Sequence, residues 1–336
     1  MQTQRTALVV GANGGIGQET CSALLRHGWQ VRALVRRAPE GEQHGIDWRI
    51  GDAMHCADVA AAATGVDVIV HAVNPPGYRG WDRLVLPMID NTIAAARVHG
   101  ARIVLPGTVY NYGPDAFPLL REDAPQHPQT RKGEIRVAME QRLQAASEAG
   151  VRVLVLRCGD FFGPRPGNNW FAQGLMQAGK PVKRLSYPGD YAIGHSWAYL
   201  PDVAETLARL LDREKELARF ERFHFGGYWA DGQAMLDAVR RGSGDDSIKA
   251  ARFPWWLAQL MSPFNETMRE LCKMRYLWRE PVQLDDRKLK AFLGEDIYTP
   301  IDQAVRARTS TRRSIRPCAH RSSAPAASPH RPNTRC

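Results

Sequence analysis

The 336-residue sequence has few cysteines, and none of them sits in a recognisable pair. No two form a C-x-x-C motif, and no spacing is typical of a metal site. No basic and apolar segments of a secretory signal precede the first expected strand. We therefore expect a protein of the reducing cytoplasm, without disulfide bonds and without a bound metal. The six cysteines are Cys21, Cys56, Cys158, Cys272, Cys318 and Cys336.

Long apolar runs are also missing. The longest, residues 66–73 and 151–156, are far shorter than the roughly 20 residues that cross a bilayer. Runs of this length are typical of buried strands. We therefore expect no membrane partner.

Acidic residues are absent from residues 306–336, which carry eight of the arginines. The net charge of the chain is +10, and 10 − 8 leaves only +2 on residues 1–305. A nearly neutral body offers no basic surface for DNA or RNA, so no nucleic-acid partner is expected. The final segment is rich in Ser, Pro, Ala and Arg, a composition that predicts disorder over residues 306–336.

Short β-branched runs alternate with longer helical patterns over the first two thirds of the chain. This alternation predicts an α/β fold, a Rossmann-like doubly wound parallel sheet with crossover helices. Ligands are expected beyond the carboxyl ends of the strands. The expected strands are residues 6–10, 30–35, 47–50, 67–72, 101–105 and 152–157, and the expected helices are 15–27, 57–64, 85–99 and 134–149.

The pattern changes after Cys158, where a Gly-Pro cluster and then dense aromatic residues follow. We predict a dinucleotide-binding domain over residues 1–157 and a smaller, discontinuous substrate-binding region. Apolar residues at helical spacing over 198–212 indicate that the chain returns to the first domain. The return segment is expected at about 195–225, and the substrate-binding region at 158–194 and 226–305.

A glycine-rich loop lies between the first expected strand and the first expected helix. Gly11 permits a tight turn, Gly14 lets the backbone approach a pyrophosphate, and Gly17 allows close packing of the helix. The amides at the helix N-terminus can then bind phosphate oxygens. The spacing therefore predicts a dinucleotide site formed by Gly11, Asn13, Gly14, Gly15, Ile16 and Gly17.

The residue that meets the adenosine ribose is expected about 20 positions further on, at the end of the second strand. Arg36 and Arg37 stand there, and no acid does. A carboxylate would hold the ribose 2′-hydroxyl, whereas guanidinium groups can bind a 2′-phosphate. The sequence therefore favours NADP(H), with NAD(H) as the alternative.

With these residues in view, the chain resembles the extended short-chain dehydrogenase/reductases, the NAD-dependent epimerase/dehydratase family, over residues 5–305. Besides the glycine loop, the resemblance rests on motifs at residues 51–52, 70–74, 157–164 and 195–204. It implies that Asp52 meets the adenine amino group. It further implies that the end of the fourth strand, with Ala72, Val73 and Asn74, lies beside the cofactor.

The resemblance also marks where the family does its chemistry. A Ser or Thr of the family holds a substrate oxygen, and the matching residue here is Thr108. The family then has a Tyr-x-x-x-Lys pair, in which the lysine lowers the phenol pKa and the tyrosine transfers a proton. Here Lys132 has the tyrosine position and Arg136 has the lysine position. The family lysine also contacts the nicotinamide ribose, which implies that contact for Arg136.

No tyrosine lies between Tyr112 and Tyr187, so a shift in register does not restore the pair. Three interpretations stay open. Lys132 could donate the proton if the neighbouring Arg136 cation depresses its pKa. Tyr110 or Tyr112 could supply the phenol from the loop after the fifth strand. Alternatively, the site has lost proton transfer and only binds the cofactor.

The resemblance implies an NADP(H)-dependent oxidoreductase or epimerase that acts on a hydroxyl or carbonyl group of a small metabolite, with sugars among the options. The missing tyrosine keeps a second hypothesis open, a catalytically reduced NADP(H)-binding sensor or regulatory protein. We expect a small-molecule substrate as the partner, and the sequence allows a homodimer.

Overall fold

The computed structural model describes residues 4–39, 45–75, 80–164, 183–295 and 297–310. Its centre is a parallel sheet of seven strands in the order β11-β7-β5-β4-β1-β2-β3. The order reverses between β1 and β4, which confirms the expected doubly wound topology. The strands are β1 (Thr6–Val10), β2 (Gln30–Val35), β3 (Ile46–Ile50), β4 (Val68–His71), β5 (Arg102–Gly107), β7 (Val153–Cys158) and β11 (Phe220–Phe225).

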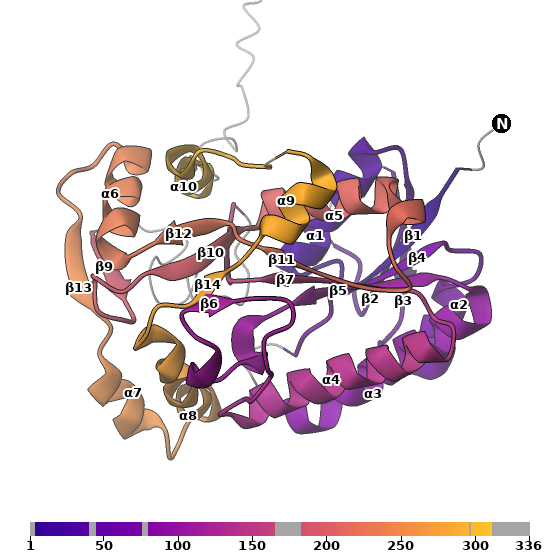
Figure 1. The fold of residues 1–336 in the computed structure, drawn as a ribbon, viewed down its shortest axis with the longest axis horizontal. Coiled ribbons are helices and arrows are strands. Elements are labelled where there is room, and N and C mark those ends of the chain that lie inside the picture. The colour runs from indigo at the N-terminus through magenta and orange to yellow at the C-terminus, as the bar shows by residue number, and fades with distance from the viewer. Residues whose placement is uncertain (1–3, 40–44, 76–79, 165–182, 296, 311–336) are drawn as a thin grey trace, which may run out of the picture.

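Helices cover both faces of this sheet (Figure 1). One face packs against α2, α3 and α4, and the opposite face packs against α1, α5 and α9. The predicted return of the chain near residues 198–212 is α5. These helices are α1 (Gly15–Arg26), α2 (Cys56–Ala62), α3 (Trp81–His99), α4 (Arg131–Glu148), α5 (Leu200–Asp212) and α9 (Arg287–Leu293).

The central strands are apolar on both faces because both faces are covered. In β7, Val153 and Val155 point into the cluster under α3 and α4, whereas Leu154 and Leu156 point into the cluster under α1 and α5. All four side chains are fully buried. Because side chains of a strand alternate between its two faces, each strand contributes to two separate cores.

The segments outside the central sheet form three small sheets, with strand orders β12-β10-β8, β13-β9 and β14-β6. Their strands are β6 (Leu119–Leu120), β8 (Asp160–Phe162), β9 (Arg184–Tyr187), β10 (His195–Tyr199), β12 (Tyr228–Ala230), β13 (Lys249–Arg252) and β14 (Gln283–Leu284). The helices of this part are α6 (Gly232–Ser243), α7 (Trp255–Met261), α8 (Glu266–Lys273) and α10 (Ile301–Ser310).

Two predictions of secondary structure need correction. The sheet has a seventh strand, β11, which pairs with β7 along its whole length. Glu221 and Arg222 interrupt its apolar pattern, and the strand tolerates them because it lies at the sheet edge. Helix α10 continues to Ser310, into the segment predicted to be disordered, and it is held by the fully buried Ala304 and Val305. The rest of that segment lies outside the described residues.

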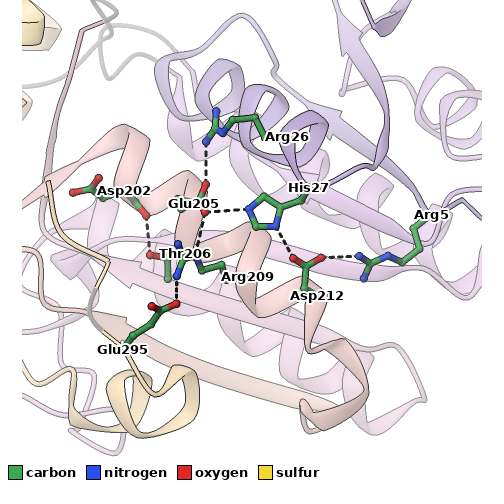
Figure 2. A network of polar contacts seen from close by, with 9 residues as sticks. All are labelled: Arg5, Arg26, His27, Asp202, Glu205, Thr206, Arg209, Asp212 and Glu295. Carbon is green, nitrogen blue, oxygen red and sulfur yellow. Dashed lines mark hydrogen bonds and ion pairs between the residues drawn. The ribbon is translucent and has the colours of Figure 1, made fainter.

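A network of charged side chains joins α1 to α5 (Figure 2). His27, directly after α1, contacts Asp212 through Nδ1 at 2.5 Å and Glu205 through Nε2 at 3.1 Å. Arg26 and Arg209 each donate to Glu205 at 3.0 Å. Burial would raise the pKa of Glu205, but its hydrogen bonds lower it to about 2. The helix that follows the glycine loop is thereby fixed at its far end.

Candidate functional site

A cavity of about 600 Å³ lies at the carboxyl ends of the central strands. The loops after β1, β2, β3, β4, β5 and β7 line it, at the edge that the doubly wound topology predicts. Of the predicted site residues, Gly17, Tyr112 and Lys132 lie outside this lining. The predicted residues that line the cavity are Gly11, Asn13, Gly14, Gly15, Ile16, Arg36, Arg37, Asp52, Ala72, Val73, Asn74, Thr108, Tyr110 and Arg136.

The glycine loop has no room for side chains at two positions. Gly11 has a φ of +85°, and a Cβ there would lie 2.7 Å from Val73 Cα. A Cβ on Gly17 would lie 2.4 Å from the carbonyl oxygen of Gly11. Gly14 is the N-cap of α1, and no capping side chain among the described residues accepts a hydrogen bond from the first amides of the helix. These amides lie beside the cavity, because the start of the helix lines it. This cradle of main-chain amides fits a pyrophosphate.

The residues predicted to contact the adenosine lie at the end of the cavity that is formed by the loops after β2 and β3. Arg36 and Arg37 both line it and are exposed to solvent. The side-chain amide of Asn13 donates to the carbonyl oxygen of Arg37 at 2.8 Å, which ties the glycine loop to the arginine pair. Asp52 follows β3, and its carboxylate accepts from the amide of Met54 at 3.0 Å. The residues that could meet an adenosine phosphate and an adenine therefore share one end.

Arg136 extends from α4 to the middle of the cavity. Its Nη2 donates to Asn74 Oδ1 at 3.1 Å, and its guanidinium lies 4.8 Å from the ring centre of Trp81. Asn74 follows β4, and Trp81 begins α3, so three elements meet at this side chain. This places Arg136 among the residues that the resemblance assigns to the cofactor.

Thr108 and Tyr110 lie on the loop after β5 and line the same cavity. The Thr108 hydroxyl is buried, and no hydrogen-bond partner for it occurs within the described residues. A buried hydroxyl without a partner costs free energy, roughly 1–3 kcal/mol, unless a ligand or water satisfies it. Thr108 Oγ1 is therefore available to form a hydrogen bond with a ligand that enters the cavity.

Buried charges hold that loop from behind. Arg157, on β7, donates to the main-chain carbonyl of Thr108, and its Nη2 donates to both Glu140 oxygens at 2.9 and 2.7 Å. Asn111 Nδ2 donates to the same carboxylate at 3.0 Å. Burial would raise the pKa of Glu140, but Arg157 and Arg222 lower it, so the carboxylate stays ionised. The position of Thr108 is thus set by a paired buried charge.

Lys132 does not face the cavity. Its side chain is 2% exposed, and its Nζ lies 2.6 Å from Glu270 Oε2 on α8. The same ammonium lies 5.6 Å from the ring centre of Trp81, which does line the cavity. Burial lowers the pKa of Lys132, and the hydrogen bond with Glu270 opposes that shift. Lys132 therefore braces a wall of the cavity, and its role as proton donor stays a prediction.

Tyr112 is also directed away from the cavity. Its ring is fully buried and lies 4.9 Å from the guanidinium carbon of Arg157. Its hydroxyl is 3.4 Å from His224 Nε2, and its carbonyl accepts from Tyr276 at 3.0 Å. Burial raises the pKa of the Tyr112 phenol. Of the two tyrosines proposed for proton transfer, the structure brings only Tyr110 to Thr108 and Arg136.

The sequence reasoning missed an acidic residue on the cavity wall. Asp160 lines the cavity, and its carboxylate lies 2.7 Å from Nε2 of His195, whose ring stacks on Trp278 with centres 4.0 Å apart. Asp160 lies within the 157–164 motif, which was the available signal. An apolar wall was missed as well, because it combines side chains of α3 with one of β8, two segments far apart in the sequence. It consists of Trp81, Leu84, Met88 and Phe161.

His71 lines the cavity at the end of β4 and is fully buried. Its Nδ1 lies 2.8 Å from the hydroxyl of Thr92. Burial, aided by the nearby Arg136 cation, lowers the pKa of His71 to about 3, which keeps the imidazole neutral. Among the described residues, no three His, Cys, Asp or Glu side chains gather to hold a metal ion, and no helix is long and apolar enough to cross a membrane.

Comparison with known proteins gives a family and a fold. The sequence model of the NAD dependent epimerase/dehydratase family matches residues 7–226. The chain is similar to a 2-alkyl-3-oxoalkanoate reductase of Stenotrophomonas maltophilia, with 30% identity over 173 residues, 47% of this chain and 51% of the relative. It is also similar to a 3-diazoavenalumate denitrifying reductase of Streptomyces sp, with 33% identity over 181 residues, 48% of this chain and 57% of the relative.

The chain thus spans about half the length of these curated relatives. Among solved structures, the fold is similar to that of UDP-glucose 4-epimerase from Bifidobacterium longum in complex with NAD+ and UDP. The TM-score is 0.69 at 16% identity, and the match covers 90% of this chain and 96% of that chain.

Proposed function

Because the chain belongs to the NAD-dependent epimerase/dehydratase family, we propose that it is an NADP(H)-dependent oxidoreductase acting on a carbonyl or hydroxyl group of a small molecule. One observation carries the proposal. A single cavity brings the glycine loop together with Arg36, Arg37, Arg136, Thr108 and Tyr110. Phosphate-binding amides, guanidinium groups and two hydroxyl side chains are what a dinucleotide and an oxygen-bearing substrate require.

The preference for NADP(H) rests on the end of β2. Arg36 and Arg37 line the cavity there, and the next described residues, Ala38 and Pro39, carry no acid. Two guanidinium groups can share a 2′-phosphate through paired N–H donors, and NAD(H) offers no such group. NAD(H) remains the alternative, since the Bifidobacterium longum epimerase is described in complex with NAD+.

The cofactor, when bound, supplies or accepts a hydride at its nicotinamide ring. Thr108 Oγ1 donates to the oxygen of the substrate carbonyl and holds it in place. Tyr110 gives the proton that this oxygen needs as it becomes a hydroxyl, and it recovers the proton from solvent. Arg136 holds the nicotinamide ribose, and Arg157 positions Thr108 through its main-chain carbonyl.

The wall of the cavity favours an apolar carbonyl compound over a nucleotide sugar as substrate. Trp81, Leu84, Met88 and Phe161 offer hydrophobic surface, and Asp160 would repel a diphosphate. Both curated relatives carry the word reductase in their names, which agrees with reduction of such a carbonyl. A sugar substrate stays the alternative.

Three further expectations remain proposals. We keep the division into a dinucleotide-binding domain (residues 1–157 with 195–225) and a substrate-binding region (158–194 and 226–305). Residues 165–182 of that region lie outside the described structure. The cytoplasmic location is supported by free thiols at the four described cysteines, Cys21, Cys56, Cys158 and Cys272. A homodimer is checked by the sedimentation experiment below.

The second candidate is a sensor that binds NADP(H) without turning it over. It is favoured by the ion pair of Lys132, which occupies the family's tyrosine position and contacts Glu270. The two candidates separate in one assay, the oxidation of NADPH with panels of apolar ketones and of nucleotide sugars. Tight NADPH binding without turnover on any compound would favour the sensor.

Two substitutions then test the residues assigned to the chemistry. Tyr110→Phe should lower kcat by roughly 100-fold or more, because it removes the proton donor. Thr108→Val should lower kcat/KM by about tenfold to a hundredfold at unchanged NADPH affinity, because it removes one hydrogen bond to the substrate. Tyr298→Phe, outside the cavity, is the matched control. Full activity of Tyr110→Phe would exclude this phenol as the donor.

A further inference from the structure

Five large apolar side chains gather on α7 and the turn that follows it. Trp256, Leu260 and Phe264 are 69%, 63% and 88% exposed, and Leu257 and Met261 are exposed as well. Trp256 and Leu260 are four residues apart and lie on one side of the helix. We call these five residues the apolar crest. Such a group of exposed apolar residues on a folded surface marks an interaction site.

The inner side of α7 packs against the rest of the protein, so the exposure of the crest does not come from a poorly packed helix. Trp255 and Ala258 are buried beneath it, and the indole nitrogen of Trp255 donates to the Pro188 carbonyl at 2.7 Å. The guanidinium carbon of Arg275 lies 5.2 Å from the centre of the Trp255 ring. Figure 1 shows α7 at an outer edge of the molecule, away from the central sheet.

Basic residues outnumber acidic ones on both sequence flanks of the crest. No charged residue occurs between positions 253 and 264, and the flanks from 249 to 280 hold six basic residues against three acidic ones, a net charge of 6 − 3 = +3. One of the three acids, Glu270, is engaged by Lys132 and Lys273. The six basic residues are Lys249, Arg252, Arg269, Lys273, Arg275 and Arg279.

We propose that the apolar crest docks onto an anionic lipid surface. Trp256, Leu260 and Phe264 would enter the headgroup layer while the basic flanks meet lipid phosphates. A second copy of the chain fits less well, because a symmetric contact would set the two basic flanks against each other. The crest is also much smaller than the roughly 20–30 residues a side of a stable interface.

The docking surface is connected to the cavity. Helix α8 follows the crest directly, and its Glu270 holds Lys132 at 2.6 Å, while Glu266 accepts from the Gly80 amide at 3.4 Å. Gly80 precedes Trp81 of the cavity wall. Docking would therefore bring the apolar wall of the cavity near the lipid. This proposal departs from the sequence-based expectation of no membrane partner, and it does not depend on the cofactor preference.

The test is co-sedimentation of the full chain with vesicles made of equal parts phosphatidylcholine and phosphatidylglycerol. The variant is Trp256→Ser/Leu260→Ser/Phe264→Ser, and the matched control is Ile50→Ser/Val98→Ser, which removes two exposed apolar side chains far along the chain from the crest. The arginine-rich segment 306–336 is present in the unaltered chain and in both variants, so its own contribution to vesicle binding is the same in all three proteins. Circular dichroism reports that each variant is folded.

We expect the triple variant to partition onto vesicles at least about tenfold more weakly than the unaltered chain, and the control to partition equally well. Sedimentation without vesicles should give the same mass for all three proteins. Equal partitioning of the triple variant and the unaltered chain would overturn the proposal. The proposal would also be overturned if the unaltered chain were a dimer, the triple variant were a monomer, and neither of them bound vesicles. The crest would then join two copies of the chain.

Discussion

The substitution Lys132→Met distinguishes a structural role of Lys132 in the cavity wall from a role as proton donor. Methionine keeps an apolar stem near Trp81 but removes the ammonium, whose Nζ lies 2.6 Å from Glu270. Removing one partner of a buried ion pair costs roughly 3–5 kcal/mol. Glu270 keeps its 2.8 Å bond to Lys273 and is 13% exposed, so we expect a loss of about 2–3 kcal/mol in the free energy of unfolding.

The partner substitution should cost more. Glu270→Gln removes the carboxylate that lies 2.6 Å from the buried Lys132 ammonium, and we expect a loss of about 3–5 kcal/mol. The double variant should lose less than the sum of the two single losses, by at least about 1 kcal/mol, because the second change removes a group that has already lost its partner. Urea unfolding of all four proteins measures these differences.

Kinetics of the same proteins decide the role of the pair. A brace predicts that Lys132→Met and Glu270→Gln change kcat in the same direction and by less than about tenfold. A proton donor predicts that Lys132→Met alone lowers kcat by roughly 10²–10⁴-fold. A loss of that size in Lys132→Met, with Glu270→Gln nearly normal, would refute the reasoning.

Three other measurements test the fold. Gly17→Ala should weaken NADPH binding, because the added Cβ would lie 2.4 Å from the carbonyl oxygen of Gly11. Fluorescence titration measures the NADPH affinity, and an unchanged affinity would show that the loop has room for a side chain at this position. Burial lowers the pKa of His71 and of His224 to about 3, against 6.5 for a free imidazole. Between these values the unfolded chain binds protons that the folded chain does not, so stability is highest above pH 6.5 and falls towards pH 3 by up to about 1.4 kcal/mol per pH unit for each histidine. Urea midpoints measured across this range check the slope, and a flat profile would show that the imidazoles are not buried. Glu205→Gln should lower the free energy of unfolding by about 1 kcal/mol, a modest figure because its ion pairs are partly exposed; an unchanged urea midpoint would mean that the network of Figure 2 adds no stability.

The central sheet could be predicted from sequence because its strands and helices carry strong local patterns. The expected limits of β1 and β2 match the observed ones, since the apolar residues at the end of each strand stop at a glycine after β1 and at a charge after β2. The start of α3 at Trp81, four residues before the expected one, was missed although Trp81, Leu84 and Val85 follow helical spacing, because Pro87 inside this segment is atypical of a helix. Strand β11 was missed because Glu221 and Arg222 are compatible with a strand only at a sheet edge.

The candidate site was predictable to the extent that it is local. The glycine loop and the arginines after β2 lie within short motifs, and all but Gly17 line the cavity. The partner of Lys132 could not be foreseen, because Glu270 is 138 residues away and reaches α4 only through the tertiary fold. The same holds for Asp160, whose position depends on how the small sheet of β8, β10 and β12 packs, and for the apolar wall, which brings Phe161 of β8 together with side chains of α3.

The most direct test of the account is the affinity of the purified chain for NADPH and for NADH, measured by calorimetric titration under identical conditions. The cavity with Arg36 and Arg37 at its adenosine end predicts that NADPH binds at least about tenfold more tightly. Tighter binding of NADH, or no binding of either dinucleotide, would contradict it.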